Sequence, residues 1–436
     1  MFNNTPAHDK QMLDTILAET VEYFLKETNP QTGLVPDRSE PGAPASIAAS
    51  GLALSVFVIA AERGLISHNI ALARVLNVLR FFNNAPQGPE PGATGYHGFF
   101  YHFLDANTGK RVQNSELSVI DTALFLIGAL VAGEYFNRGT PEENSVFWLA
   151  ENIYKKTDWV WATNGQDAIC HGWRPGAGFL PYYWNSGYNE AHLLYILALG
   201  SPTFPVNQKA YLNWTNTFET RTYYDTTCTY AAPLFIHQLP QCWLNFKGIQ
   251  DDYNRRTGMD YFENSRRATI IQQQYAIDNP HKFAEYGPFC WGFTASDGPG
   301  PVKLKINSRE KEFFGYIARG APDGPDDGTV SPWAVAASLP FTPAIVIDSL
   351  RYAIGHFGLK KERSFGFEAS FNPSFPENSK NPNGWVSPWK FALNQGPVIL
   401  MIDNFQNGLM WKLTSHCPYI INGLRRAGFS GGWLSS

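Results

Sequence analysis

Two stretches of the chain are apolar on nearly every side of a helix, and they restrict the fold more than any other feature. They cover residues 46–63 and 115–137. A helix without a polar face has to be enclosed by other elements. Further helical periods are predicted over residues 13–25, 69–82, 143–155, 190–199 and 251–274. We therefore expect an inner layer of helices that is enclosed by other helices.

Long segments rich in glycine, proline and aromatic residues separate these helices. They cover residues 83–98, 167–189, 286–301, 319–332 and 371–388. Irregular segments of this length in a compact domain are usually functional. Short β-like pieces at residues 99–104 and 302–306 predict small hairpins among them. No change in composition marks a linker, so we expect one domain over residues 1–436.

Charge and composition argue against several classes of protein. Charged residues make up 17% of the chain and the formal net charge is −4, without a run of lysine or arginine. Nucleic acid is therefore not expected as a partner. The 31 Phe, 20 Tyr and 13 Trp offer flat apolar surfaces that suit sugars. The sequence has no GxxxxGKS/T or strand-linked GxGxxG motif, which disfavours phosphoryl-transfer and dinucleotide chemistry.

The cysteines and histidines do not predict a metal or disulfide site. The five cysteines lack a CxxC motif and the histidines lack ligand spacing, so we expect free thiols, no metal and no cofactor. The most apolar stretch, residues 117–132, is shorter than the roughly 20 residues of a membrane span. The first residues show no export signal. We expect a soluble protein, cytoplasmic or, if a signal was removed, periplasmic or secreted; the oligomeric state stays open.

Seven passages, in order along the chain, carry a family resemblance. They read GLVPDRS (33–39), YHGFFYHFLDANTGKR (96–111), SELSVIDTALFLIGAL (115–130), GWRPGAGFLPYYWNSGYNEAHLLYILALGSPTFPV (172–206), EYGPFCWGFTASDGPG (285–300), DGTVSPWAVAASLPF (327–341) and GPVILMIDNFQNGLMW (396–411). They resemble the bacterial glucoamylase-like family, which includes endo-β-1,2-glucanases and the processing domain of cyclic β-1,2-glucan synthases. The resemblance implies an all-α fold: an (α/α)6 barrel of twelve helices in two rings, with a glycan cleft at one end. It also implies an inverting glycoside hydrolase that cuts β-1,2-glucan internally.

Glycoside cleavage needs a protonated carboxylic acid at the leaving oxygen and an ionised carboxylate that attacks or activates water. Glu190 follows the loop WNSGYN and opens an apolar helix. The helix dipole alone would explain a glutamate in a first turn, but the resemblance favours Glu190 as the general acid. Asp403 ends the apolar run 398–402. The resemblance favours Asp403 as the base over a buried capping aspartate.

Asp121 interrupts an apolar helix, where burial is costly without a partner. A structural pairing is as well supported as a role in binding sugar hydroxyls or as an alternative acid or base. Sugar binding is assigned to loop residues: Trp173, Tyr188, Trp291, Trp333 and Trp385 as stacking platforms, and Arg38, His97, Asn189 and Asp297 as polar partners. Each aromatic residue would equally pin its loop to the barrel, and a turn alone explains Asp297 before glycine.

Two other functions stay open. A transglycosylase or an exo-acting enzyme would keep the same barrel but disfavour water or block one end of the cleft. A glycan-binding protein would keep the cleft and lack the chemistry. The variant Glu190→Gln separates the last case, because such a protein has no activity to lose.

Overall fold

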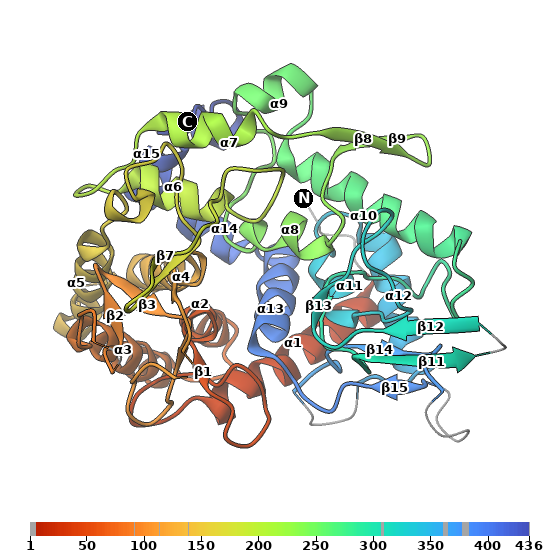
Figure 1. The fold of residues 1–436 in the computed structure, drawn as a ribbon. Helices are drawn as coiled ribbons and strands as arrows, with labels where there is room; N and C mark the ends of the chain where they lie inside the picture. The colour runs from red at the N-terminus through yellow and green to blue at the C-terminus, as the bar shows by residue number, and fades with distance from the viewer. Residues whose placement is uncertain are drawn as a thin grey trace.

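An inner ring of helices lies at the centre of the protein (Figure 1). The computed structural model describes residues 6–435 except residues 91, 113, 138, 307–308, 361–364 and 377–382. The ring consists of α2 (Ile47–Glu62), α4 (Val119–Phe136), α6 (His192–Gly200), α8 (Leu234–Gln238), α11 (Pro332–Ala337) and α13 (Ala392–Gln406). Successive helices of the series α11, α13, α2, α4 and α6 contact one another, and α8 contacts α11. Helices α2 and α4 are buried along nearly their whole length, as their apolar sequences predict.

A second set of helices covers this ring from outside. It consists of α1 (Ala7–Glu27), α3 (His68–Asn84), α5 (Pro141–Lys156), α7 (Gln208–Thr215), α10 (Tyr261–Asp278) and α12 (Pro343–Gly355). Several are amphipathic; α3, for example, buries Ala71, Val75 and Leu79 on one side. Helix α1 contacts α13 and α2, α3 contacts α2, α5 contacts α4, α10 contacts α8 and α12 contacts α11. The described part of the chain thus holds twelve helices in two rings, which confirms the expected (α/α)6 fold.

Two helix boundaries differ from the prediction. The period over residues 251–274 is split into α9 (Asp252–Thr257) and α10, because Gly258 takes a left-handed φ of 69° that ends α9. Glu190, expected to open a helix, lies in a turn just before α6. Two further short helices, α14 (Leu409–Thr414) and α15 (Pro418–Arg426), contact α13 and α6, respectively.

Glycines bring the main chains of α2 and α4 together. A Cβ at Gly51 would lie 2.3 Å from Phe125 Cα, and a Cβ at Gly128 would lie 2.1 Å from Gly51 O. Neither position has space for a side chain, so this close crossing requires glycine. Helix α4 has the length and apolar composition of a membrane span, but 89% of it is buried inside the protein, as in a core helix.

Short strands bring the starts of the inner helices together at one end of the ring. Strand β1 (Ala45–Ser46) leads into α2 and pairs with β4 (Phe103–Leu104). A five-stranded antiparallel sheet leads into α4; its order is β2 (Gly95–Tyr96), β3 (Phe99–Tyr101), β5 (Leu117–Ser118), β6 (Gly172–Arg174) and β7 (Gly178–Phe179). Helix α13 starts at the same end, because Ala392 N donates to Asp37 O. We call this end the N-terminal end of the ring.

The remaining strands form two-stranded hairpins or pairs. They are β8 (Thr220–Tyr223) with β9 (Thr226–Thr229), β10 (Ala295–Ser296) with β13 (Ile317–Ala318), β11 (Val302–Ile306) with β12 (Arg309–Phe313), and β14 (Phe371–Asn372) with β15 (Trp385–Val386). The β-like pieces predicted at residues 99–104 and 302–306 are therefore strands. In Figure 1 the pairs β11–β12 and β14–β15 lie together at one side of the rings.

Candidate functional site

Glu190 lies in the turn that precedes α6 and is half-buried. Asn189 holds this turn: its Oδ1 accepts from Ala191 N at 3.0 Å, and its Nδ2 donates to the carbonyls of Ser186 and Gly187, each at 3.3 Å. Burial raises the pKa of Glu190 to about 7, and the negative charge of Asp121 adds to this shift. Glu190 is therefore a carboxyl group that is about half protonated at neutral pH and can give a proton there. Asn189, expected to bind sugar, shapes the turn that carries Glu190.

Asp121 lies in the first turn of α4 and is 8% exposed. Ser118, the N-cap of this helix, donates from Oγ to Asp121 Oδ2 at 2.5 Å and accepts from Asp121 N at 3.2 Å. His102 Nε2 lies 3.5 Å from the same Oδ2. Asp121 is thus a buried aspartate with partners, as its place in an apolar helix requires, and its partners are Ser118 and His102.

His102 connects Asp121 to a third acidic residue. Its Nδ1 lies 3.1 Å from Glu116 Oε1, and its ring stacks on Phe103 with the centroids 3.9 Å apart. Burial alone would lower the pKa of His102, but the negative charges of Asp121 and Glu116 raise it to about 9. The hydrogen bond from His102 in turn lowers the pKa of Glu116 to about 2. At neutral pH an imidazolium therefore lies between the Glu116 carboxylate and the side chain of Asp121.

Asp37 is a further carboxyl group at this end of the ring. Burial raises its pKa, the charge of Asp121 adds to the shift, and Arg38 and His102 oppose it. We call Asp37, His102, Glu116, Asp121 and Glu190 the acidic cluster. Arg38 lies beside the cluster, 3.5 Å from Asp37 Oδ2, but its guanidinium is mainly engaged by Glu40 at 2.5 Å.

Asp403 lies outside the acidic cluster, which contradicts its expected role as the base. Its side chain is 0% exposed, and Arg63 donates to Oδ1 from Nε at 2.8 Å. Asn407 Nδ2 donates to the same oxygen at 3.1 Å. Asp403 stands eleven residues after the first residue of α13, so it lies about 16 Å further along the helix axis. The apolar run before it continues a helix toward the opposite end of the ring.

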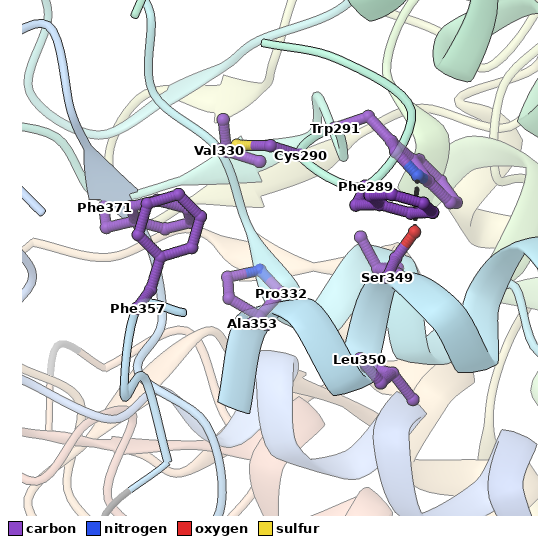
Figure 2. A pocket seen from close by; sticks show the side chains of 11 residues that line it. Phe289, Cys290, Trp291, Val330, Pro332, Ser349, Leu350, Ala353, Phe357 and Phe371 are labelled. Carbon is purple, nitrogen blue, oxygen red and sulfur yellow. Dashed lines mark hydrogen bonds between the residues drawn. The ribbon is translucent and has the colours of Figure 1, made fainter. Parts of the chain in front are cut away.

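Three of the expected sugar platforms are buried in the protein, which contradicts that role for them. Trp291 is 0% exposed and donates from Nε1 to Ser349 Oγ at 2.9 Å (Figure 2). Trp333 is 4% exposed in the first turn of α11. Tyr188 is 7% exposed and packs against the rings of His192, Phe218, His237 and Tyr261. These side chains pin their loops to the helices, as the alternative interpretation held.

The other predicted sugar-binding residues are half-buried. His97 stacks on Trp161 with centroids 4.3 Å apart and lines a groove of about 430 Å³ between the ends of α3 and α5. Trp173 lies in β6 beside the ring of Tyr96, 5.1 Å away. Trp385 stands opposite Asn372 in the pair β14–β15. Their roles, and that of Asp297, stay predictions.

Four residues at this end were not selected as site residues from the sequence. They are Asp37, His102, Glu116 and Tyr316. Asp37 precedes Arg38 in GLVPDRS, and Glu116 stands five residues before Asp121, so both lie within the passages that carry the family resemblance. Tyr316 has no such signal. Within the described residues, no three His, Cys, Asp or Glu side chains are grouped so that they could hold a metal ion.

Comparisons with known proteins identify the family of the chain. A family model described as "Putative glucoamylase" matches residues 181–418. The crystal structure of a putative glucoamylase from Bacteroides uniformis is 30% identical, covers 99% of this chain and 100% of its own, and has a TM-score of 0.84. The crystal structure of a β-1,2-glucanase from Parabacteroides distasonis is 25% identical, covers 97% of this chain and 60% of its own, and has a TM-score of 0.82.

One curated relative also matches. It is an exo β-1,2-glucooligosaccharide sophorohydrolase (non-reducing end) from Parabacteroides distasonis, 26% identical over 97% of this chain. The chain spans 58% of the length of that relative.

Proposed function

Because the chain belongs to the family described as putative glucoamylases, we propose that it is a glycoside hydrolase that cleaves β-1,2-linked glucan at the acidic cluster. Two relatives of 25% and 26% identity are named for action on β-1,2-glucan or β-1,2-glucooligosaccharides, and their names supply the linkage. The cluster supplies the chemistry, which needs a carboxylic acid and a carboxylate on one substrate. The observation that carries the proposal is Glu190, whose pKa of about 7 keeps a proton available.

We assign Glu190 as the general acid and Asp121 as the carboxylate that acts as the base. Glu190 is half-buried, with its pKa raised to about 7. Asp121 instead accepts a hydrogen bond from Ser118 at 2.5 Å and has the His102 ring at 3.5 Å. Different environments for two neighbouring carboxyl groups separate an acid from a base. Inversion of the anomeric configuration, implied by the family resemblance, completes this assignment.

We propose that the enzyme cleaves the glucan internally, and we keep cleavage from a chain end as the second candidate. The second mode is favoured by the name of the curated relative, an exo enzyme acting at the non-reducing end. Both modes use the same acid and carboxylate, and so does a transglycosylase. They differ in the products that appear first.

Digestion of linear β-1,2-glucan tests the function. Internal cleavage should release oligosaccharides of many lengths at the earliest times in thin-layer chromatography, whereas cleavage from a chain end releases one short product. Proton NMR of the same digest should show the α-anomer first, and a β-anomer would exclude inversion. Glucans with β-1,3, β-1,4 and α-1,4 linkages serve as controls. Turnover of one of these without turnover of β-1,2-glucan would contradict the proposed linkage.

The pH dependence of turnover should show the ionisation of Glu190. The acid must be protonated to act, and its pKa is about 7, so kcat/KM should fall about tenfold per pH unit above this value. A rate that stays constant up to pH 9 would contradict the assignment. The Glu190→Gln variant provides the control, because its residual rate should no longer fall above pH 7.

A further inference from the structure

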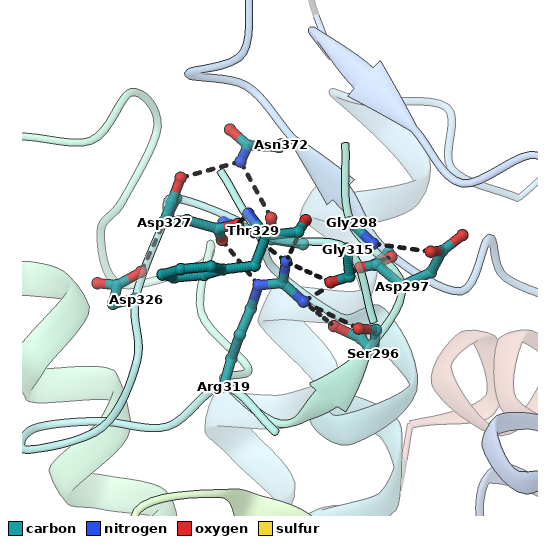
Figure 3. Close-up of polar contacts among 12 residues, drawn as sticks. Ser296, Asp297, Gly298, Gly315, Arg319, Asp326, Asp327, Thr329 and Asn372 are labelled. Carbon is teal, nitrogen blue, oxygen red and sulfur yellow. Dashed lines mark hydrogen bonds and ion pairs between the residues drawn. The ribbon is translucent and has the colours of Figure 1, made fainter. Parts of the chain in front are cut away.

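Arg319 is a fully buried arginine that joins two loop segments (Figure 3). Its side chain is 0% exposed and binds Asp327 with two hydrogen bonds, Nε to Oδ1 at 2.7 Å and Nη2 to Oδ2 at 2.8 Å. Its other N–H groups donate to main-chain carbonyls: Ser296 at 2.9 Å, Phe314 at 3.0 Å, Gly315 at 3.1 Å and Asp297 at 3.3 Å. The guanidinium is rigid and planar, so its hydrogen bonds fix the positions of the carbonyl groups that accept from it.

The two segments that Arg319 joins carry Asp297 and Tyr316. One follows β10, and the other runs from β12 to β13. The main chain closes tightly around the guanidinium, since a Cβ at Gly298 would lie 2.1 Å from Arg319 Nη2. Asp327 adds a further tie by accepting from Phe314 N at 2.8 Å. The buried ion pair of Arg319 and Asp327 thus fixes the main chain around Tyr316, which stands three residues before Arg319.

Tyr316 extends from this support toward the acidic cluster. Its ring lies 5.9 Å from that of Phe391, the N-cap of α13, and Phe391 pairs through its main chain with Arg38. The surrounding protein and the charges of Asp37, Asp121 and Asp297 raise the pKa of its hydroxyl. Tyr316 is nevertheless 57% exposed, and among the described residues its hydroxyl has no hydrogen-bond partner. A protonated phenol in this place has an unused donor and an unused ring face.

The free hydroxyl and the free ring face of Tyr316 together suit a sugar ligand. A sugar offers oxygen acceptors for the hydroxyl and an apolar C–H face for the ring. We propose that Tyr316 is a substrate-binding residue that contacts the glucan beside Asp121, and that Arg319 is a positioning residue that holds Tyr316 there. This inference rests on the proposed function, because the ligand is the glucan of that reaction.

Steady-state kinetics on β-1,2-glucan test the role of Tyr316. We expect Tyr316→Phe to raise KM up to about tenfold, because one neutral hydrogen bond is lost, and Tyr316→Ala to lower kcat/KM about 100-fold, because the ring contact is lost as well. The control is Tyr224→Phe on the β8–β9 hairpin, an exposed tyrosine that also faces a carboxylate, Asp278. Its kinetics should equal those of the parent protein.

The positioning role of Arg319 needs a second readout. Arg319→Lys keeps the charge but loses the two-pronged contact, so it should raise KM more than it lowers kcat. In the Tyr316→Ala background the same change should raise KM no further, because Arg319 acts through Tyr316. If Arg319→Lys does not fold, the two Tyr316 variants alone decide the inference.

The outcomes separate this inference from the proposed function. A parent protein that turns over β-1,2-glucan, with Tyr316→Ala within twofold of it, overturns the role of Tyr316 and leaves the function standing. A parent protein without turnover overturns the function and this inference together. Equal effects of Arg319→Lys with and without Tyr316 overturn the positioning role alone.

Discussion

The Glu190→Gln variant is expected to bind β-1,2-glucan like the parent protein and to lose turnover, with kcat about 100-fold to 10,000-fold lower. Glutamine keeps the shape and the hydrogen-bonding oxygen of glutamate but has no proton to give to the leaving oxygen. The side chain is half-buried and forms no ion pair among the described contacts, so the fold should be kept. Steady-state kinetics on the glucan and calorimetric binding of a short β-1,2-oligosaccharide measure the two effects separately.

A substrate with a better leaving group distinguishes acid catalysis from a general disturbance. An aryl β-glycoside with a nitrophenol leaving group needs little protonation, so the Glu190→Gln variant should lose far less activity on it. Equal losses on both substrates would show that Glu190 acts by another route. Near-parental turnover on the glucan would assign the acid to a different carboxyl group.

The matched control is Glu263→Gln. Glu263 is also a half-buried glutamate, but it lies in the first turn of the outer helix α10 and pairs with Arg266 at 2.7 Å and Arg267 at 2.8 Å. Loss of each of these surface ion pairs changes stability by less than about 1 kcal/mol. Turnover should stay at the parental level. A similar loss in both variants would remove the argument for Glu190.

The two-ring fold could be predicted because its signal lies in local sequence. An apolar sequence on all sides of residues 46–63 and 115–137 requires enclosure by other helices, and α2 and α4 are enclosed. The glycine that separates α9 from α10 was missed, because one glycine inside a periodic segment is often tolerated in a helix. The closure of the ring depends on contacts between distant segments, so it came from the family resemblance rather than from periodicity.

Asp121 and Asp403 show which part of the site could not be predicted. Both interrupt apolar helices, and both are buried with partners. The inner helices α2, α4 and α13 begin at the same end, so an acid in a first turn reaches that end and an acid in a last turn reaches the other. Asp121 follows the capping residue Ser118 by three positions, whereas Asp403 stands in the last turn of α13. The two aspartates differ in which end of the ring they reach. The sequence pattern does not show at which end the site lies, so it could not separate their roles.

The sequence also did not identify His102 as a site residue, and it assigned sugar binding to tryptophans that are buried. His102 meets Glu116 because the antiparallel pairing of β3 with β5 brings residues fourteen positions apart into contact, and neither strand is longer than three residues. Strands this short have no alternating pattern to read. The two tryptophans were misplaced for different reasons. Trp291 is a buried apolar anchor of its long loop, whereas Trp333 lies in the first turn of helix α11. Tyr316 is exposed although its loop has a composition similar to that around Trp291, so loop composition alone does not separate exposed from buried aromatic residues.

The Asp121→Asn variant is expected to fold and to lower kcat about 100-fold to 10,000-fold, because asparagine cannot accept the proton of the attacking water. A second readout reports on the same site. Asp121 is the largest cause that raises the pKa of His102 to about 9, so this pKa should fall when the charge is removed. NMR titration of the His102 ring measures the shift independently of turnover. An unchanged pKa would mean that the two side chains are further apart than 3.5 Å in solution.

The comparison with Asp403→Asn decides between the two aspartates. Asp403 pairs with Arg63, whose side chain is only 13% exposed. Loss of this ion pair in Asp403→Asn should lower the free energy of unfolding by about 3 kcal/mol. Below the unfolding transition, kcat per folded molecule should equal that of the parent. Asp121→Asn should show the reverse, a large kinetic loss with little change in stability. If Asp403→Asn instead abolished turnover in a folded protein, the charge at the far end of α13 would have to act on the reaction, and the assignment of Asp121 as the base would fail.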